Sequence, residues 1–517
     1  MSEPSKARHG PKIAAVIDIG ATAMRMVVAE ILSDGEWRKL DRVTRPIPFG
    51  RDVFTRGEIS PELMRQSVRI FESFKELLAS WQVDDVQIIA TSAIREARNR
   101  DTFIDRVFIR TGLRVNILEG VEENFLTFIA VQHRVSPLRA QFARSSTLII
   151  EVGGGSTELM LLQRGKMAAA HSLGMGTVRL AQQVNPTYDS ASQIEDYLRE
   201  NIRVTRWLLD AELSLGRVRY FVAVGGDARL VAKVAGKEKG EGYWIVEKGD
   251  FVAFLTGLRS SSVEDCVREL GINYTEAEGL VPALLIYNEF LSATEADHLI
   301  VPDVSVREGV LMSFALGTDK LVQREFHSQV VAGAISLGRK YHFDETHALH
   351  VAKHALSLFD QLGTEHGLDE HARLQLEVAA VLHDIGNYIR PSGHHKHGQY
   401  IVANSEIFGL SRSDLRVISN IVRYHRKSPP TGSHMSYVSL RREARIVVLK
   451  LSSLLRIADA LDRSHTQRLT EFRLDRNDDE VLLYCTHQGD ISVERFGLGM
   501  KRKMFEDVFG YSINIAH

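Results

Sequence analysis

Two acidic, glycine-containing segments have the residue types and the spacing to bind a phosphorylated ligand. Residues 18–23 begin with an aspartate and follow the apolar stretch 13–17, and residues 151–158 begin with a glutamate and follow the apolar stretch 147–150. Small residues let backbone N–H groups approach a phosphate, and a carboxylate at a strand end can hold the accompanying divalent cation. An ordinary strand and turn explains either segment alone. Two of them, 133 residues apart (151 − 18), predict a duplicated domain that closes on one phosphorylated ligand.

The overall composition is that of an ordinary globular protein. With 517 residues, the chain should form roughly three or four domains. The net charge is −2, so any attraction for polyanions must be local. Cys266 and Cys485 provide neither a disulfide framework nor a zinc spacing, and no stretch approaches the roughly 20 apolar residues of a membrane span. Because residues 1–12 also lack an apolar signal region, we expect a soluble, cytoplasmic protein that does not engage membranes.

Strands and helices alternate around both segments, which predicts α/β domains with binding residues at the strand ends. The expected elements are a strand at 24–31, a turn at Asp34 and Gly35, a helix that opens at Ser60, and strands at 86–90, 159–162 and 220–224. Glycine pairs at strand ends are often simple turns. Here Gly225 and Gly226 follow the last of these strands, so they are candidates for a third phosphate-binding turn.

Six short motifs together resemble the exopolyphosphatase/guanosine pentaphosphatase (Ppx/GppA) phosphatase family. They lie between residues 13 and 315 in the family's order: Asp18-Ile19-Gly20, residues 91–97, residues 120–123, residues 153–158, Gly225-Gly226 and Arg307-Glu308-Gly309. The resemblance implies a two-lobed α/β core that is ribonuclease H-like and belongs to the actin and sugar-kinase superfamily. We expect its first lobe at residues 12–137 and its second at residues 138–320.

The family's chemistry is hydrolysis of a terminal phosphoanhydride bond, in which water attacks the end phosphorus in line. The resemblance implies that Glu123 positions and deprotonates this water, and that Asp18, Glu151 and Glu158 hold Mg²⁺. It further implies that eight residues bind the phosphate groups: Gly20, Thr22, Arg95, Gly154, Gly155, Ser156, Gly225 and Gly226. A surface ion pair with Glu96 is the alternative role for Arg95.

The expected substrate is inorganic polyphosphate, from which an exopolyphosphatase releases orthophosphate. The alternative is hydrolysis of guanosine pentaphosphate at its 5′ end. A third hypothesis is a polyphosphate- or nucleotide-binding sensor with weak hydrolysis, because the chain departs from the family pattern. Ala21 and Ala23 stand where the family has hydroxyl residues, Glu151 replaces an aspartate, and Asp227 adds negative charge near the phosphates. The resemblance also implies a homodimer.

From Phe326 onward helical periodicity dominates and histidines cluster. The order His347, His383-Asp384, Asp459 resembles the HD-domain metal phosphohydrolases. It implies an all-α HD domain at residues 321–465, in which these four residues hold Mn²⁺, Fe²⁺, Mg²⁺ or Zn²⁺. Asp384 would bridge two ions, with His397 and His425 completing the second, and the domain would then be a second hydrolase acting on nucleotides. The alternative is a metal-free HD fold that serves as a binding surface.

A basic stretch lies within this helical region. Between residues 423 and 463 there are nine Lys or Arg residues and three Asp or Glu residues. It could steer a long polyphosphate towards the core, although a solvated face is the ordinary explanation. Residues 466–517 should form a small α+β cap with strands at 480–485 and 491–495. The sequence contains no nucleic-acid-binding motif, so we expect no nucleic-acid partner.

Overall fold

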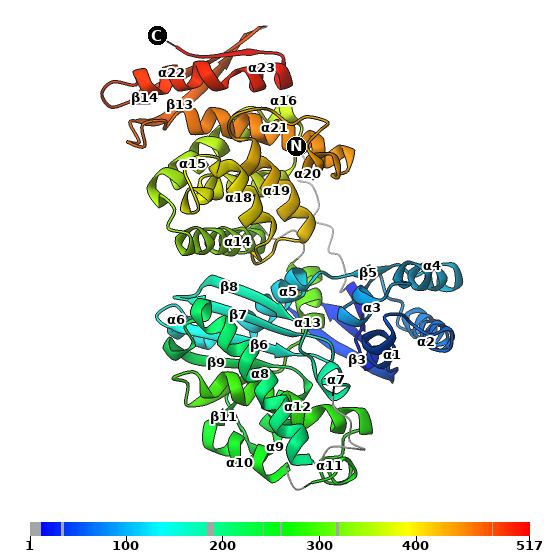
Figure 1. The fold of residues 1–517 in the computed structure, drawn as a ribbon. Coiled ribbons are helices and arrows are strands. Elements are labelled where there is room, and N and C mark those ends of the chain that lie inside the picture. The colour runs from blue at the N-terminus through cyan, green and yellow to red at the C-terminus, as the bar shows by residue number, and fades with distance from the viewer. Residues whose placement is uncertain are drawn as a thin grey trace, which may run out of the picture. The chain divides into compact units, whose positions relative to one another are not determined.

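The computed structural model divides into two compact units, Met1–Glu325 and Phe326–His517 (Figure 1). The division falls within helix α14 (Lys320–Lys340). The residues that the structure describes are 12–32, 36–183, 191–240, 242–258, 261–316, 320–477 and 479–516. The turn expected at Asp34 and Gly35 lies outside them.

The first sheet of unit 1 has five strands in the order β3-β2-β1-β4-β5. The strands are β1 (Lys12–Ile19), β2 (Ala23–Ile31), β3 (Trp37–Pro46), β4 (Asp85–Ala90) and β5 (Val115–Ile117). β1 to β3 form an antiparallel meander, whereas β4 and β5 run parallel to β1. β1 is buried from Ala14 to Ile19, which explains its almost continuous apolar sequence. The strands expected at 24–31 and 86–90 are confirmed.

The second sheet repeats this arrangement and extends it. Its order is β10-β11-β12-β9-β6-β7-β8, in which β8-β7-β6-β9-β12 has the same strand directions as β3-β2-β1-β4-β5. The strands are β6 (Ser146–Val152), β7 (Thr157–Gln163), β8 (Lys166–Leu173), β9 (Val218–Val224), β10 (Lys237–Glu238), β11 (Tyr243–Glu247) and β12 (His298–Pro302). The repeated topology agrees with the duplication that the paired segments predict, and it places their ends at equivalent positions.

Helices connect and cover these sheets. They are α1 (Phe49–Arg56), α2 (Pro61–Ser80), α3 (Ser92–Glu96), α4 (Arg100–Thr111), α5 (Gly120–Arg134), η1 (Ser136–Leu138), α6 (Arg139–Phe142), α7 (Thr177–Ala181), α8 (Ala191–Leu213), η2 (Leu215–Arg217), α9 (Gly226–Ala235), α10 (Lys248–Leu258), α11 (Val263–Leu270), α12 (Tyr274–Ser292) and α13 (Val306–Leu316). The helix expected at Ser60 is confirmed as α2, because the Ser60 hydroxyl accepts from the Leu63 N–H and Pro61 occupies the first turn.

Two of these helices cross at close range and carry site residues. A Cβ added to Gly309 of α13 would lie 2.2 Å from the Leu126 carbonyl oxygen of α5. Only glycine therefore permits the two backbones to approach this closely. Since α5 carries Glu123 and α13 carries Arg307, this crossing fixes where both side chains enter the site.

Unit 2 is built mainly from helices around one hydrophobic core. After α14 these are α15 (Glu345–Gln361), α16 (Gly363–His366), α17 (Glu370–Leu382), η3 (Ile385–Tyr388), α18 (His394–Ala403), α19 (Arg412–Tyr424), α20 (Met435–Val438), α21 (Arg442–Ala460), α22 (Ser492–Lys501) and α23 (Lys503–Phe509). α17, α19 and α21 are each buried over more than half of their residues, which suits helices that present side chains to an internal site.

A small three-stranded sheet completes unit 2, with β14 (Glu480–His487) between β13 (Leu469–Arg476) and β15 (Ser512–Ile515). The strand expected at 480–485 is confirmed as part of β14. The strand expected at 491–495 is wrong, because this segment begins α22, which buries Glu494 and Leu498 on one helical face. The sheet contributes Val481, Leu483 and Ile513 to the same core as the helices.

The basic stretch at residues 423–463 is not a uniformly solvated surface. Arg456 is buried and donates to the carbonyl oxygens of Tyr424 and Lys427, and Lys450 donates to that of His366. Among the helices that the structure describes, none combines the length and the apolar character required to cross a bilayer.

Candidate functional site

A cavity of about 380 Å³ in unit 1 lies where the parallel strands of both sheets end. Nine of the residues expected at the site line it: Asp18, Gly20, Thr22, Glu123, Glu151, Gly154, Ser156, Gly225 and Gly226. Arg95, Gly155 and Glu158 do not line it. The structure therefore brings together three carboxylates and the small residues of three strand-end turns.

Asp18 at the end of β1 forms an ion pair with one arginine and lies opposite a second. Arg307 of α13 donates to its Oδ2 at 2.7 Å, and both side chains are buried. Arg25 is the residue opposite Asp18 in the antiparallel pairing of β1 with β2. Burial lowers the pKa of Arg25, and the Asp18 carboxylate partly offsets this shift. These contacts fix the Asp18 carboxylate, and they add positive charge next to the space that a phosphate would occupy.

Glu123 enters the cavity from the first turn of α5. The helix begins with a reciprocal capping box, in which the Glu122 side chain accepts from the Glu119 N–H at 2.8 Å. Burial raises the pKa of Glu123 to about 7, and the negative charges of Glu151 and Asp18 act in the same direction against the opposing effect of Arg95. A carboxylate with this pKa can accept a proton near neutral pH.

Arg95 positions Glu123 and does not face the cavity. Its guanidinium donates to the Leu118 carbonyl oxygen at 2.5 Å and lies 3.3 Å from Glu123 Oε2. Glu96, the alternative partner considered from the sequence, instead accepts two hydrogen bonds from Arg179. Arg95 is therefore placed to orient the carboxylate, while its phosphate-binding role stays a prediction.

Glu151 and Glu158 are direct partners across the antiparallel pair β6 and β7. Thr127 of α5 donates to Glu151 at 2.6 Å, and Ser172 donates to Glu158 at 2.8 Å. Burial raises the pKa of both carboxyl groups, and the charge of Glu123 raises that of Glu158 further. Several carboxylates in one partly dry site repel one another, and a bound dication would relieve this repulsion. The oxygen donors of Asp18 and Glu151 suit Mg²⁺.

Glycine is required at these positions around the cavity for different structural reasons. A Cβ on Gly155 would lie 2.3 Å from Ser92 Oγ, so glycine is needed here for the close contact between the β6–β7 turn and α3. Gly225 has a φ of +138°, a conformation that side-chain-bearing residues rarely adopt. A Cβ on Gly154 would lie 2.9 Å from the Ala21 methyl group, so the two phosphate-loop candidates touch each other.

Several cavity residues were not expected from the sequence. Four arginines line it, namely Arg25, Arg42, Arg229 and Arg307. The antiparallel pairing of β1 with β2 could have indicated Arg25. Arg307 belongs to the motif Arg307-Glu308-Gly309, to which no role was assigned from the sequence. Asp227 lines the cavity as expected, and burial together with the charge of Glu276 raises its pKa to about 7.

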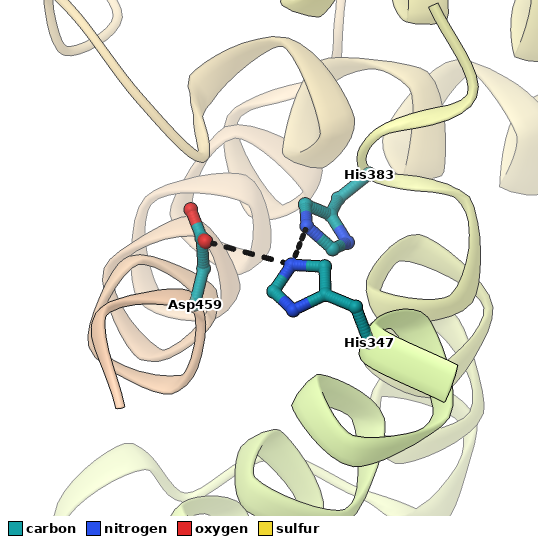
Figure 2. Close-up of side chains that lie close together, drawn as sticks. All are labelled: His347, His383 and Asp459. Carbon is teal, nitrogen blue, oxygen red and sulfur yellow. Dashed lines mark hydrogen bonds and ion pairs between the residues drawn. The ribbon is translucent and has the colours of Figure 1, made fainter. Parts of the chain in front are cut away.

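Unit 2 contains a second group of possible ligands (Figure 2). His347 of α15, His383 at the end of α17 and Asp459 of α21 point towards one another, with ligand atoms within 4.8 Å. Asp384 lies in two further groups, one with His347 and His465 and one with His394 and His425. The four residues expected here are therefore close together, as is His425. His397 is absent from these groups, and His394, one turn earlier on α18, takes its place.

A cavity that joins glycine turns, carboxylates and arginines is typical of an enzyme that handles phosphate groups. A model of the Ppx/GppA phosphatase family matches residues 27–317, and a model of Ppx/GppA phosphatase domain III matches residues 331–489. The chain belongs to the Ppx/GppA phosphatase family.

Curated relatives match nearly the whole chain. A guanosine-5′-triphosphate,3′-diphosphate pyrophosphatase of Pseudoalteromonas translucida is 25% identical over 478 residues, 91% of both chains. One of Vibrio atlanticus is 23% identical and covers 92% of this chain and 93% of its own. Among solved structures, an exopolyphosphatase from Cytophaga hutchinsonii matches 59% of this chain and 98% of its own, with a TM-score of 0.54 and 20% identity. At this identity the structural match shows the fold alone.

Proposed function

We propose that the chain hydrolyses the terminal phosphoanhydride bonds of inorganic polyphosphate and releases orthophosphate. The observation that carries this proposal is the convergence of Glu123, Asp18 and Glu151 on one cavity, with four arginines around them. Membership of a phosphatase family makes the chain a phosphoric anhydride hydrolase. The Cytophaga relative is named as an exopolyphosphatase, which agrees with this substrate.

In the proposed reaction, Glu123 takes a proton from the attacking water. Its pKa of about 7 suits a base at neutral pH, and Arg95 holds its carboxylate in place. Asp18 and Glu151 would hold Mg²⁺, which neutralises phosphate charge when bound. Arg25, Arg229 and Arg307 would bind phosphate oxygens, and the turns at Gly20, Gly154 and Gly226 would provide backbone N–H groups.

The test is orthophosphate release from polyphosphate with Mg²⁺ by the full chain. Glu123→Gln should lower the rate about 10²- to 10⁴-fold, because the amide cannot accept the proton. Glu122→Gln is the matched control, since glutamine can preserve the helix cap that Glu122 forms. A Glu123→Gln enzyme that retains the original rate would contradict the assignment.

A second candidate substrate, guanosine pentaphosphate, is favoured by a neighbouring cavity of about 480 Å³. This cavity shares Ala21, Thr22, Thr177 and Gly279 with the phosphate cavity. Much of its remaining lining is apolar, including Leu198, Leu258, Val263, Val281 and Pro282. A polyphosphate chain has no apolar part to place there, whereas a nucleoside does. The Pseudoalteromonas and Vibrio relatives are named for a guanosine nucleotide.

The two substrates can be separated by filling the apolar cavity. Ala181 of α7 lines this cavity and not the phosphate cavity. Ala181→Trp should raise the KM for guanosine pentaphosphate about tenfold or more if the nucleoside binds there, and it should leave polyphosphate hydrolysis within about twofold. If Ala181→Trp impaired the hydrolysis of both substrates equally, the apolar cavity would not select between them.

The finer domain organisation is also part of the proposal. Ribonuclease H-like lobes at 12–137 and 138–320 are supported by the repeated strand order. An HD-type domain at 321–465 is supported by the helical ligands His347, His383 and Asp459, and a cap at 466–517 by the three-stranded sheet. A homodimer in the cytoplasm stays a prediction, which light scattering and cell fractionation would test.

A further inference from the structure

Arg179 of α7 connects the β6–β7 turn (residues 153–156) to helices α1 and α3. Its Nε donates to the Gly155 carbonyl oxygen at 3.0 Å, and its Nη2 donates to the two carboxylate oxygens of Glu96 at 2.8 and 2.7 Å. Its guanidinium lies over the Phe54 ring, with Cζ 4.2 Å from the ring centroid. A guanidinium can make these contacts together because it is planar and carries several N–H donors.

The backbone of α7 holds the same turn. The Val178 N–H donates to the Gly154 carbonyl oxygen at 2.9 Å, and the side chain of Arg179 adds the carbonyl oxygen of Gly155. The peptide unit between Gly155 and Ser156 is planar and trans, so a fixed carbonyl group also points the Ser156 N–H away from Arg179. Because Ser156 lines the phosphate cavity, Arg179 controls the direction of a backbone donor at this cavity.

Helix α3, at the other end of the connection, controls the orientation of Glu123. Arg95 directly precedes Glu96 on this short helix. Its guanidinium donates to the Leu118 carbonyl oxygen at 2.5 Å and lies 3.3 Å from Glu123 Oε2. Since Leu118 lies just before α5 begins, Arg95 holds both the start of that helix and the carboxylate. A displacement of α3 would therefore displace Glu123.

Close packing leaves little freedom where these elements meet. A Cβ on Gly155 would lie 2.3 Å from Ser92 Oγ of α3 and 2.4 Å from Phe54 Cζ of α1. Helix α7 also packs against α1 (Figure 1). The guanidinium of Arg179 thus contacts the turn, α1 and α3 at the point where the three come together. Closely packed groups move together, so a change at Arg179 should be felt by all three.

We infer that Arg179 is a positioning residue, which holds the β6–β7 turn and α3 so that a bound terminal phosphate and the Glu123 carboxylate keep their relative position. This role rests on the proposed function, because it concerns the same site. Arg179 itself lines neither the phosphate cavity nor the apolar cavity. Its loss should therefore affect the alignment of water and phosphorus, and hence the rate, more than the binding of the substrate.

The test compares kcat and KM for orthophosphate release from polyphosphate with Mg²⁺ by the full chain. Arg179→Met should lower kcat about 10- to 100-fold and leave KM within about threefold, because the residues that line the cavity are unchanged. Arg373→Met is the matched control. Arg373 donates two hydrogen bonds to Asp360 of unit 2, and 22% of its side chain is exposed, against 23% for Arg179. Its kcat should stay within about twofold of the wild type.

A double-mutant cycle tests the connection through Glu96. Glu96→Ala should also lower kcat, but less than Arg179→Met does, because Arg179 keeps its bond to Gly155. In the Arg179→Met protein, the further change Glu96→Ala should lower kcat by no more than about twofold, since the two residues act as one unit. Losses that multiply fully would show that the residues act separately, and would overturn the inference.

Binding measurements separate positioning from a general structural role. In a Glu123→Gln protein, adding Arg179→Met should leave the Kd for polyphosphate within about threefold and the circular dichroism spectrum unchanged. An Arg179→Met enzyme with the original kcat, or one that loses substrate binding together with kcat, would overturn the inference. If Glu123→Gln alone retained the original rate, the proposed function would fail. If Glu123→Gln were inactive and Arg179→Met fully active, the positioning role alone would fail.

Discussion

The two candidate sites of this chain carry their charged and polar groups on different kinds of secondary structure. In unit 1, carboxylates lie at strand ends beside glycine turns, and Arg307 and Arg25 supply fixed positive charge. In unit 2, imidazoles project from helices, and backbone carbonyl oxygens fix the ring orientations. The strand ends of unit 1 border a cavity of about 380 Å³, which can admit an anion.

The two sites differ in the donor atoms that they offer to a cation. Oxygen donors and a cavity of about 380 Å³ suit Mg²⁺ that arrives with a phosphorylated substrate. At the second site, His347 and His383 offer imidazole nitrogens, and 1% and 0% of their side chains are exposed. Four arginines line the first site, while Lys501 contacts Asp459 at the second.

The largest stability effect should come from the buried ion pair of unit 1. Arg307→Met leaves Asp18 charged, buried and without this partner, which should cost about 3–5 kcal/mol of unfolding free energy and reduce phosphate release. Arg38→Met is the control, because the Arg38–Glu30 pair has an arginine that is 70% exposed and should contribute less than about 1 kcal/mol. Thermal unfolding followed by circular dichroism measures both. Equal effects would show that Asp18 does not depend on Arg307.

Matched glycine substitutions would test whether the two sites function independently. Gly309→Ala forces α13 away from α5, and Gly386→Ala places a Cβ 2.0 Å from the His394 carbonyl oxygen. Overpacking of this kind costs roughly 1–3 kcal/mol. We expect Gly309→Ala to lower the phosphatase rate. If unit 2 binds metal as the HD-domain resemblance implies, Gly386→Ala should lower the metal content of the chain while the rate stays within about twofold.

Gly249→Ala in α10 and Gly499→Ala in α22 are the controls, since an added Cβ meets open space at both positions. Both should stabilise their helices slightly. If Gly386→Ala reduced phosphate release as strongly as Gly309→Ala, the two sites would not be chemically independent.

The smallest effect concerns Asp227, whose folded pKa of about 7 lies above its unfolded value. A raised carboxyl pKa contributes stability that is fully present below the unfolded pKa of about 4 and is lost progressively as the pH rises to about 7. Asp227→Asn removes this loss, so its melting temperature should exceed that of the wild type at pH 8, and the difference should shrink progressively as the pH falls towards about 4. A pH-independent difference would contradict the assigned shift.

The same variant bears on the sensor hypothesis. If the charge of Asp227 weakens substrate binding, Asp227→Asn should lower the KM for polyphosphate several-fold at pH 8 and change it less at pH 6, where the wild-type carboxyl is largely protonated. An enzyme whose wild type already turns over rapidly, with no change in the variant, would remove the reason for that hypothesis.

Sequence by itself determined the features that depend on neighbouring residues. Apolar runs predicted β1 and β6, and the Ser60-Pro61 pair predicted the start of α2, because strand burial and helix capping are local. The strand prediction at 491–495 was wrong because such a short stretch fits both the strand and the helix periodicity. Packing of Leu498 against the core of unit 2 favours the helix.

Only the tertiary structure decided how distant side chains pair. Arg307 reaches Asp18 across 289 residues of sequence, and Arg95 is turned towards Glu123 and the Leu118 carbonyl oxygen, away from the cavity. His394 joins the candidate ligand groups in place of His397, because one helical turn changes which ring reaches Asp384. The sequence determined which ligand types are present, but the closeness of α5 to α13, and of η3 to α18, determined which of them meet.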